Sequence, residues 1–478
     1  MDAELSRRKR RVPAWWADAK LGIFIHWVPA SVPGFAPTDV EIGDLLTARE
    51  PAPLSRIPYS EWYENSLRFP DSPVSAFHRD TYGNRPYAEF ADDFVAGLGS
   101  WDPDDWARRF AATGARYVVL VTKHHDGWCL WPSAVPNPHR PGWFSERDLV
   151  GELATAVRAA GMRFGVYYSG GYDWTFDATP IGSVAAGLEA IPGGDYPGYA
   201  DRQVRELIDR YQPSLLWNDI AWPAPRAPLE EQFSYYFDRV PDGVVNDRWM
   251  PTTGMIRAAG HPRLRPLVDG VMRRSAQKSG GLVPPTPPFF QYRTPEFTTF
   301  EEIQTTPWEC VRGMDHGFGY NRTSTEADHL GHDDLLRSLV DIAATGGNLL
   351  LNVGPRGEDA TIPDAQLRRL DWMAEFSTTT AAALQGTRPW VRPRATTPEG
   401  VEVRFTAHGD RVWAMCWSPS GTMPGSITLP VRSTPTTSVT ALDGAMLAAE
   451  PAATGLLVAT PASDLPIVAI ALDHVVAT

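Results

Sequence analysis

The sequence has few cysteines and no long apolar run, and both shortages narrow the class of protein. Its three cysteines, Cys129, Cys310 and Cys416, lie far apart and lack a CxxC spacing. Neither a disulfide framework nor a thiolate zinc site is therefore indicated, and a reducing compartment, the cytoplasm, is expected. No stretch approaches the roughly 20 apolar residues that span a bilayer, so no membrane partner is expected.

Positive charge is also in short supply, with 44 Lys and Arg against 57 Asp and Glu and a formal net charge of -13. This balance argues against nucleic acid or an anionic membrane as the partner and favours a neutral ligand. The basic run at residues 7–11 is followed by Asp18 and Lys20 rather than by an apolar segment. We interpret it as a solvated tail and not as an export signal.

Aromatic residues are plentiful, with 18 Trp, 15 Tyr and 19 Phe in 478 residues. Flat apolar rings of this kind offer surfaces on which a sugar ring stacks. The 43% hydrophobic content supports a folded, globular protein with a well-buried core.

Short apolar runs alternate with amphipathic patterns over most of the chain. Such runs indicate strands that are covered on both faces, and the alternation predicts a parallel sheet with helices around it. The predicted strands are 21–27, 117–122, 163–169, 214–219, 244–247 and 348–355, and the predicted helices are 148–161, 199–211, 229–240 and 333–347. No Gly-rich phosphate loop follows a strand, so an α/β fold of the (β/α)8-like TIM barrel type is favoured over an open nucleotide-binding sheet.

The amino-acid composition changes near Gly386, where the chain becomes rich in Thr and Val and is interrupted by Gly and Pro. Segments such as 401–419 and 426–430 are typical of antiparallel strands. We predict a catalytic barrel over residues 1–386 and a small C-terminal antiparallel β-sandwich over residues 387–478.

Polar side chains end most of the predicted barrel strands. They include His26, Lys123 to Asp126, Tyr167, Trp217 to Asp219, and Asp247 to Trp249. Because the active site of a (β/α)8 barrel lies at the carboxyl ends of its strands, these side chains are expected to converge on one rim.

Seven motifs in this order resemble glycoside hydrolase family 29, the retaining α-L-fucosidases, over about residues 15–390. They include KLGIFIHW, YVVLVTKHHDGWCLWPS, LLWNDIAWP, VVNDRW, WECVRGMDHGFGYNR and GGNLLLNVGPRGEDATIPD. The resemblance implies an exo-acting hydrolase that forms a covalent fucosyl-enzyme intermediate. It also implies a fucosylated oligosaccharide or small α-L-fucoside as the substrate, and neither a metal nor another cofactor.

Asp219 matches the nucleophile of the family. The acid/base is expected on a less regular loop, where Glu296 is favoured and Glu309 is the competitor, interpreted as a structural carboxylate. A retaining mechanism needs the two carboxyl groups about 5 to 5.5 Å apart, a distance that the sequence cannot measure.

The resemblance also implies a set of substrate-binding residues, namely His26, Glu61, Trp62, His124, His125, Tyr167, Trp217 and Arg248. For Arg248, a salt bridge to Asp247 or a neighbour is the alternative. Asn348 and Asn352 are expected to tie loops together. The motifs depart from the commonest family form at Val28 and at Ile220, which follows Asp219, and either change is expected to alter the rim of the pocket.

Two other functions stay open at this point. His124 and His125, with His26 and Asp219, could form the metal site of a barrel hydrolase if the chain turns sharply after Thr122. The chain could also be a fucose-binding protein without catalysis. The sequence leaves open the preferred linkage and whether the chain forms a homo-oligomer.

Overall fold

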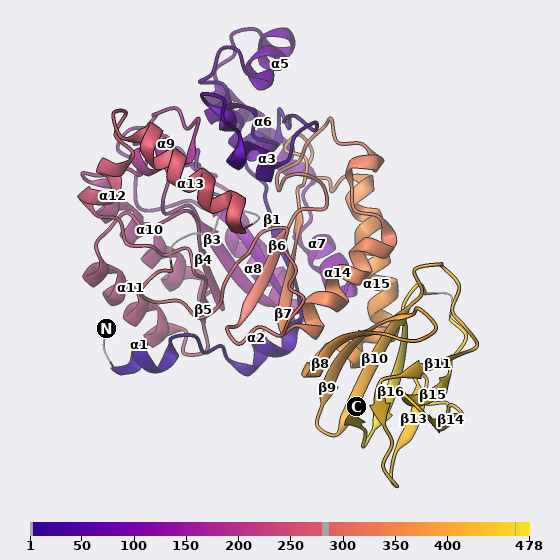
Figure 1. Cartoon of the computed structure of the whole chain (residues 1–478). Coiled ribbons are helices and arrows are strands. Elements are labelled where there is room, and N and C mark those ends of the chain that lie inside the picture. Colours follow the sequence, from indigo (N-terminus) through magenta and orange to yellow (C-terminus); the bar gives the residue numbers. More distant parts are fainter. Residues whose placement is uncertain (1–2, 280–285, 464) are drawn as a thin grey trace.

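A parallel sheet surrounded by helices forms the first four-fifths of the chain (Figure 1). The computed structural model describes residues 3–279, 286–463 and 465–478. Within them, the parallel strands are β1 (Leu21–Ile25), β2 (Tyr117–Lys123), β3 (Arg163–Tyr168), β4 (Leu215–Asn218), β5 (Val244–Val245), β6 (Trp308–Arg312) and β7 (Gly347–Val353). They pair in the order β5-β4-β3-β2-β1-β7-β6.

Helices connect these strands along their outer side, as the alternating pattern predicts. They are α7 (Pro103–Ala112), α8 (Leu149–Ala159), α10 (Tyr196–Tyr211), α11 (Arg226–Arg239), α14 (His332–Ala344) and α15 (Asp364–Leu384), with α1 (Ala3–Arg8) and α2 (Ala14–Ala19) ahead of β1. Helix α8 illustrates the local cause: Asp148 caps its first turn by accepting from the Gly151 N–H at 2.9 Å. Its apolar residues are buried, and Gly161, just past its end, has the positive φ that suits glycine.

The sheet is curled, and an irregular segment stands where a closed barrel would have its eighth strand. Among the described residues no ladder joins β5 to β6. Instead, residues 291–296 lie between them: the Gln291 N–H donates to the Val245 carbonyl at 3.2 Å, and the Glu309 N–H donates to the Arg293 carbonyl at 2.8 Å. The (β/α)8-like prediction is confirmed in this form, while β6 was missing from the predicted strands and β5 is shorter than predicted.

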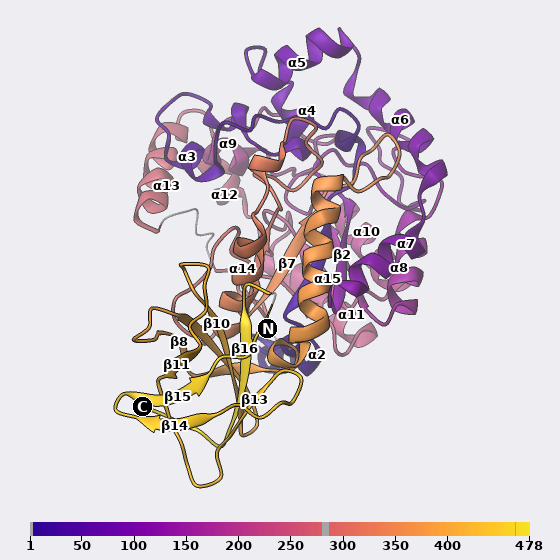
Figure 2. The same ribbon diagram turned by 90° about the vertical axis from the view of Figure 1, so that its right-hand side faces the viewer.

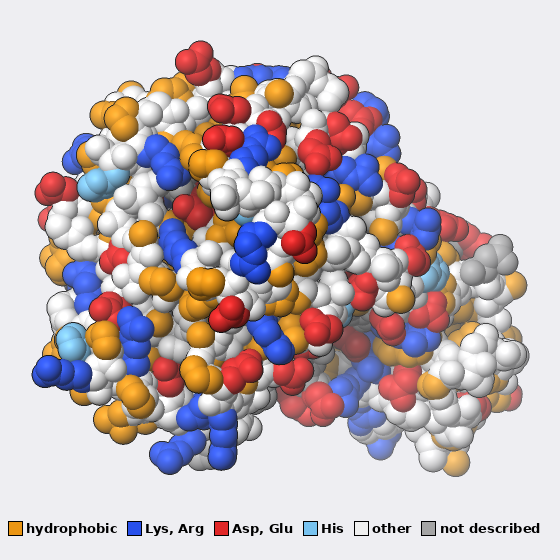
Figure 3. Space-filling model, turned by 90° about the horizontal axis from the view of Figure 1, so that it is seen from above, with side chains coloured by type: hydrophobic (Ala, Val, Ile, Leu, Met, Phe, Trp, Pro, Cys, Tyr) orange, Lys and Arg blue, Asp and Glu red, His pale blue; other side chains and the backbone are white. Residues whose placement is uncertain are grey.

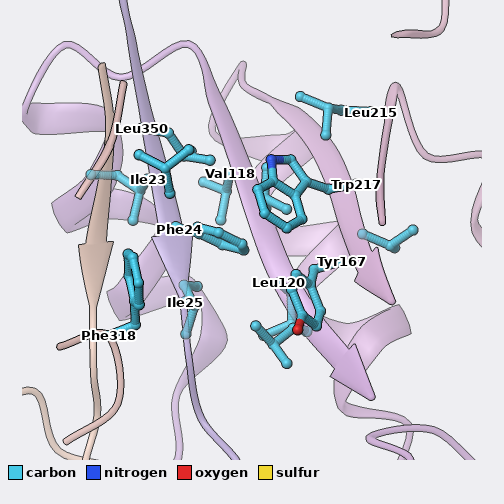
Figure 4. Close-up of a cluster of buried hydrophobic side chains, with 14 of the residues drawn as sticks. Ile23, Phe24, Ile25, Val118, Leu120, Tyr167, Leu215, Trp217, Phe318 and Leu350 are labelled. Atoms are coloured by element: carbon cyan, nitrogen blue, oxygen red, sulfur yellow. The ribbon is translucent and has the colours of Figure 1, made fainter. Parts of the chain in front are cut away.

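The interior enclosed by the sheet is filled largely by aromatic side chains. Phe24 on β1, Tyr167 on β3 and Trp217 on β4 lie on the same, inner side of the sheet with Phe318 (Figure 4). The ring centroids of Phe24 and Trp217 are 5.3 Å apart, and Trp217 stacks on Tyr167 at the same separation. This packing forms the floor beneath the carboxyl ends of the strands.

Long connections cover the carboxyl ends of the strands, at the top of Figure 1. They carry α3 (Ile42–Thr47), α4 (Tyr63–Ser66), α5 (Pro73–Tyr82), α6 (Phe90–Gly97), α9 (Val184–Glu189), α12 (Gly254–Ala259) and α13 (Arg265–Ser279). Seen from above, this face mixes acidic, basic and hydrophobic side chains (Figure 3). The sheet therefore ends beneath a cover of polypeptide and not at open solvent.

The C-terminal part is antiparallel. Strands β8 (Arg388–Thr396), β9 (Glu402–His408), β10 (Arg411–Trp417), β13 (Ser438–Ala441) and β16 (Val468–Asp473) form one sheet, in the order β13-β16-β10-β9-β8. Strands β11 (Ser426–Leu429), β15 (Gly455–Ala459) and β14 (Ala449–Ala452) form a second, and β12 (Val431–Arg432) pairs with β17 (Val476–Ala477). The predicted division into domains at residues 386 and 387 stays a prediction.

The larger C-terminal sheet packs below α14 and α15, beside the barrel (Figure 2). On β10, Trp413, Met415 and Trp417 belong to the core of the barrel, whereas the residues between them belong to the core of the β-sandwich. This alternation follows from the two-residue period of a strand, which directs successive side chains to opposite faces. An ion pair between Arg404 and Asp341 further joins β9 to α14.

Candidate active site

The polar strand ends predicted from the sequence meet above the aromatic floor. Asp219 follows β4 directly, and its carboxylate accepts three hydrogen bonds. The Tyr167 hydroxyl donates to Oδ2 at 2.8 Å, while the Ile220 N–H and Arg248 Nη1 donate to Oδ1 at 2.8 and 3.2 Å. These donors hold the carboxylate in one orientation at the mouth of the barrel.

Arg248 bridges two carboxylates with a single guanidinium group. Its Nη1 lies 3.2 Å from Asp219 Oδ1, and its Nη2 lies 2.6 Å from Glu296 Oε1. Burial opposes the charged form, but Glu296 and Asp219 outweigh it and raise the pKa of Arg248. The expected salt bridge of Arg248 to Asp247 or a neighbour is thus formed with the neighbours Asp219 and Glu296. Asp247 instead accepts two hydrogen bonds from Thr294, at 3.1 and 2.6 Å.

Glu296 reaches this position because it ends the segment that closes the barrel. It forms a parallel bridge with Val311 on β6, and the Val311 N–H donates to the carbonyl of Pro295 at 3.0 Å. Glu309 lies two residues before Val311, in the barrel interior, where it is fully buried and accepts from the Tyr117 hydroxyl at 2.6 Å. The structure brings Glu296 to Asp219 through Arg248 and leaves Glu309 deeper in the core.

His124 and His125 both turn toward the pocket, although successive residues of a strand would diverge. The register of β2 shifts between Val121 and Lys123, and the two rings that follow are 4.0 Å apart. Lys123 points away and forms a buried ion pair with Asp173 at 2.7 Å. The sharp turn considered in the sequence therefore occurs, and it brings both imidazoles to one side.

The three histidines are neutral, and the hydrogen bonds of His26 and His125 leave Nε2 of each ring as an acceptor. Burial lowers the pKa of His26 to about 4 and the pKa values of His124 and His125 well below their usual range. His26 Nδ1 donates to Asn352 Oδ1 at 2.5 Å, so Asn352 fixes the tautomer of this ring as well as tying a loop.

His125 is fixed in the same way. Its Nδ1 donates to Ser169 Oγ at 2.6 Å, and the Ser169 hydroxyl in turn donates to the carbonyl of Tyr172. His125 Nε2 then lies 3.8 Å from Asp219 Oδ2, so two acceptors face each other. A ligand hydroxyl placed between them would donate to either one, which is the chemistry of a polyol ligand.

Glu61 and Trp62 reach the site from the covering segment, in a short 3-10 helix, Ser60–Trp62. Glu61 accepts from the Gly319 N–H at 2.8 Å, and burial raises its pKa to about 7. The Trp62 ring stands perpendicular to His125, with centroids 5.3 Å apart. The early loop therefore supplies one carboxyl group and one apolar face to the pocket.

Comparison with known proteins agrees with this geometry. The sequence model described as α-L-fucosidase matches residues 2–381. The chain belongs to the α-L-fucosidase family. Over 456 residues it is 31% identical to an α-L-fucosidase of Branchiostoma floridae, a match that covers 91% of this chain and 85% of the relative.

Solved structures place the whole chain in the α-L-fucosidase fold. An α-fucosidase of Thermotoga maritima in complex with a mechanism-based inhibitor superposes with a TM-score of 0.81 at 36% identity, covering 99% of both chains. The same enzyme in complex with fucose gives a TM-score of 0.80 at 36% identity, over 98% of this chain and 99% of the other. Both the barrel and the C-terminal sheets are thus included in the likeness.

Several residues of this α-L-fucosidase site were not found by sequence reasoning. The Tyr59 hydroxyl lies 3.5 Å from Glu296 Oε2, the Phe318 ring stacks on His26 at 5.2 Å, and Thr294 Oγ1 accepts from Arg248 Nε at 3.1 Å. Tyr59 precedes the SEWYENS motif by one residue, so its closeness to Glu61 was a usable signal. Phe318 lies within the WECVRGMDHGFGYNR motif, which was also a usable signal, whereas Thr294 comes from a loop without a periodic pattern and only the fold brings it here.

Neither a metal cluster nor a membrane helix is found in the described ranges. Among residues 3–279, 286–463 and 465–478, no group of three or more His, Cys, Asp and Glu side chains is arranged to hold a metal ion. In the same ranges, no helix is both long and apolar enough to cross a membrane.

Proposed function

We propose that this member of the α-L-fucosidase family removes terminal α-L-fucose with net retention, using Asp219 as the nucleophile and Glu296 as the general acid and base. The observation that carries the proposal is the shared guanidinium of Arg248, 3.2 Å from Asp219 and 2.6 Å from Glu296. One small planar group in contact with both carboxylates keeps them close together. Retaining hydrolases need a separation of about 5 to 5.5 Å.

The chemistry proceeds in two displacements. In the first, an Asp219 oxygen forms a bond to the anomeric carbon while the bond from that carbon to the glycosidic oxygen breaks, and protonated Glu296 transfers its proton to the departing oxygen. In the second, water loses a proton to the Glu296 carboxylate and attacks the same carbon. The ester bond breaks, which releases fucose and the free Asp219 carboxylate.

Binding of the sugar follows from the donors and acceptors around Asp219. Neutral His26 and His125 offer Nε2 acceptors, and the carboxyl group of Glu61 offers a further acceptor to neighbouring hydroxyls. Trp62 and Phe318 offer apolar faces for the C5 methyl group and the ring. Largely buried side chains beneath covering loops suit a terminal sugar better than the middle of a chain, which supports exo action.

The first test is proton NMR of the purified protein acting on an aryl α-L-fucoside with a chelator present. We expect the earliest free fucose to be the α anomer, because two inversions restore the starting configuration. Early β-fucose would refute retention. Activity that is lost with chelator and restored by a divalent metal would favour the metal-dependent hydrolase, and binding of fucose without hydrolysis would favour the inactive binding protein.

Asp219→Gly tests the nucleophile. We expect loss of nearly all turnover, on the order of 10³-fold or more, with the unfolding temperature little changed, because the residue is needed for bond formation rather than for folding. Asp238→Asn, on the exposed side of α11, is the matched control and should keep wild-type turnover. Wild-type activity of Asp219→Gly would make the assignment wrong.

Glu296→Ala tests the acid/base. Its rate should fall far more for fucosides with poor leaving groups than for activated aryl fucosides, because only the former need protonation. Azide should restore turnover of the activated substrates, since this anion needs no general base. Glu302→Ala, an exposed glutamate of the same loop, is the control. An equal loss for both leaving groups would count against Glu296.

A cytoplasmic location is part of this proposal, and the linkage preference and the oligomeric state can be measured directly. Cell fractionation, a panel of α1,2-, α1,3-, α1,4- and α1,6-linked fucosides, and sedimentation of the purified chain would address them in turn.

A further inference from the structure

The residue after each proposed catalytic carboxylate has a left-handed backbone. Ile220, after Asp219, has a φ of 70°, and Phe297, after Glu296, has a φ of 49°. Such values are uncommon for residues with a β-carbon, and for β-branched or bulky ones they are outliers. Among the described residues, seven that are not glycine have a φ in the left-handed region, and Ile220 is the one β-branched side chain of this set.

The turn at Asp219 is tightly held. The Ala221 N–H donates to the Asp219 carbonyl at 2.9 Å, which closes a three-residue turn centred on Ile220. The Gly171 N–H donates to the same carbonyl at 3.2 Å, and Asn218 Nδ2 donates to the Ala221 carbonyl at 2.9 Å. Because the surroundings fix the turn on several sides, the strained backbone persists.

The strained turn aims the Asp219 side chain. In this conformation the Ile220 N–H points back to Asp219 Oδ1, at 2.8 Å. The Ile220 side chain packs directly on Gly171, where an added β-carbon would lie 2.6 Å from Ile220 Cβ. The contact between Ile220 and Gly171 therefore limits rotation of the Asp219–Ile220 peptide group, whose N–H donates to the Asp219 carboxylate.

Glu296 is held in a related way. The Phe297 N–H donates to the Val311 carbonyl at 3.0 Å, and the Phe297 ring packs on Phe318, with centroids 5.4 Å apart. The backbone of Glu296 and Phe297 is thus fixed against β6, and the Glu296 side chain accepts from Arg248 Nη2 at 2.6 Å. A residue with a left-handed backbone thus follows both carboxylates.

We propose that Ile220 and Phe297 are positioning residues, whose left-handed backbone fixes the directions of the Asp219 and Glu296 carboxylates. The inference rests on the proposed function, because it assigns the two carboxylates their catalytic roles. A residue with a β-carbon has few conformations in this region, so it confines the carboxylate before it. Glycine would adopt the same φ without strain but would also reach others.

The experiment compares alanine and glycine at each position: Ile220→Ala with Ile220→Gly, and Phe297→Ala with Phe297→Gly. Both substitutions remove the side-chain packing, but only glycine frees the backbone. We measure the unfolding temperature, kcat and KM with an activated and an unactivated aryl α-L-fucoside. Wild-type turnover in the same assay tests the proposed function separately.

We expect each glycine variant to unfold at the same or a higher temperature than its alanine partner, because glycine relieves the strain. Its kcat should nevertheless be lower, on the order of tenfold to 100-fold, since small misplacements of reacting groups have effects of this size. Ile220→Gly should slow both substrates, because every leaving group needs the nucleophile. Phe297→Gly should slow mainly the unactivated substrate, which needs the acid.

Equal kcat values for the alanine and glycine variants of an active enzyme would overturn the positioning role and leave the proposed function intact. A lower kcat that merely accompanies a lower unfolding temperature would also overturn it, because it would indicate general damage to the fold. An identical leaving-group dependence at both positions would contradict the assignment of the two turns to different carboxylates.

Discussion

Replacement of Glu309 by Gln tests whether this carboxyl group has a structural or a catalytic role. Glu309 is fully buried near the amino end of β6, and burial raises its pKa to about 8 from an ordinary 4.5. Glutamine keeps the size of the side chain and an oxygen that accepts from the Tyr117 hydroxyl. The variant therefore removes the ionisation and little else.

The expected effect is a change in the pH dependence of stability. A raised pKa means that the folded protein binds this proton more tightly than the unfolded chain does, so the stabilisation is complete below pH 4.5. It is lost as the pH rises from there to about 8. One pKa unit corresponds to about 1.4 kcal/mol, so the loss reaches about 3 kcal/mol at pH 7 and about 5 kcal/mol above pH 8.

The assay is urea unfolding of wild-type protein and Glu309→Gln between pH 4.5 and pH 8.5. The difference in unfolding free energy between the two should shift in favour of Glu309→Gln by about 1.4 kcal/mol per pH unit between the two pKa values, and it should level off above about pH 8. Any cost of burying the amide is independent of pH and offsets the whole curve without changing its slope. Turnover of both aryl fucosides should stay within a few-fold of wild type.

Two results would refute this reasoning. A flat difference curve would show that Glu309 does not titrate between the folded and unfolded states as its burial requires. A selective loss of activity on poor leaving groups, restored by azide, would make Glu309 the acid/base and Glu296 a bystander.

Two further predictions concern the support of the site. Lys123→Met should destabilise the protein by about 3 to 5 kcal/mol, because it leaves Asp173 buried without its partner. In thermal unfolding, the double variant Lys123→Met/Asp173→Asn should recover part of this loss. No recovery would mean that Lys123 acts by packing alone. Met415→Ala, at the contact between β10 and the barrel, should cost about 2 to 5 kcal/mol in urea unfolding, whereas a cost near zero would show that this contact is loosely packed.

The sequence was sufficient for the outline of the fold because the signals involved are local. Largely apolar runs such as residues 117–122 need cover on both faces, and amphipathic helices such as α8 carry their own cap and end signals. Together they predict a parallel sheet with helices outside. The short β6 and the irregular segment 291–296 were not predicted, because their extended form depends on neighbours on either side and not on their own pattern.

The candidate site was likewise predicted in part from the sequence and in part decided only by the fold. That His26, His124, His125 and Asp219 gather at one rim follows from the sequence, since the carboxyl ends of parallel strands meet at one edge. Which carboxylate lies near Asp219 does not follow, because Glu296 and Glu309 are both plausible along the chain. Closure of the barrel by residues 291–296 brings Glu296 to Arg248, while the register of β6 places Glu309 in the core.

The sequence alone thus determined the class of fold, the family resemblance and one edge of the pocket, since these depend on periodicity and on motifs in a fixed order. Only the tertiary structure decided which polar groups are partners, which imidazole nitrogens carry protons, and where the backbone is strained beside the carboxylates. Those features arise from contacts between segments far apart in the chain, such as Arg248 with Glu296 and His26 with Asn352, and no local pattern encodes them.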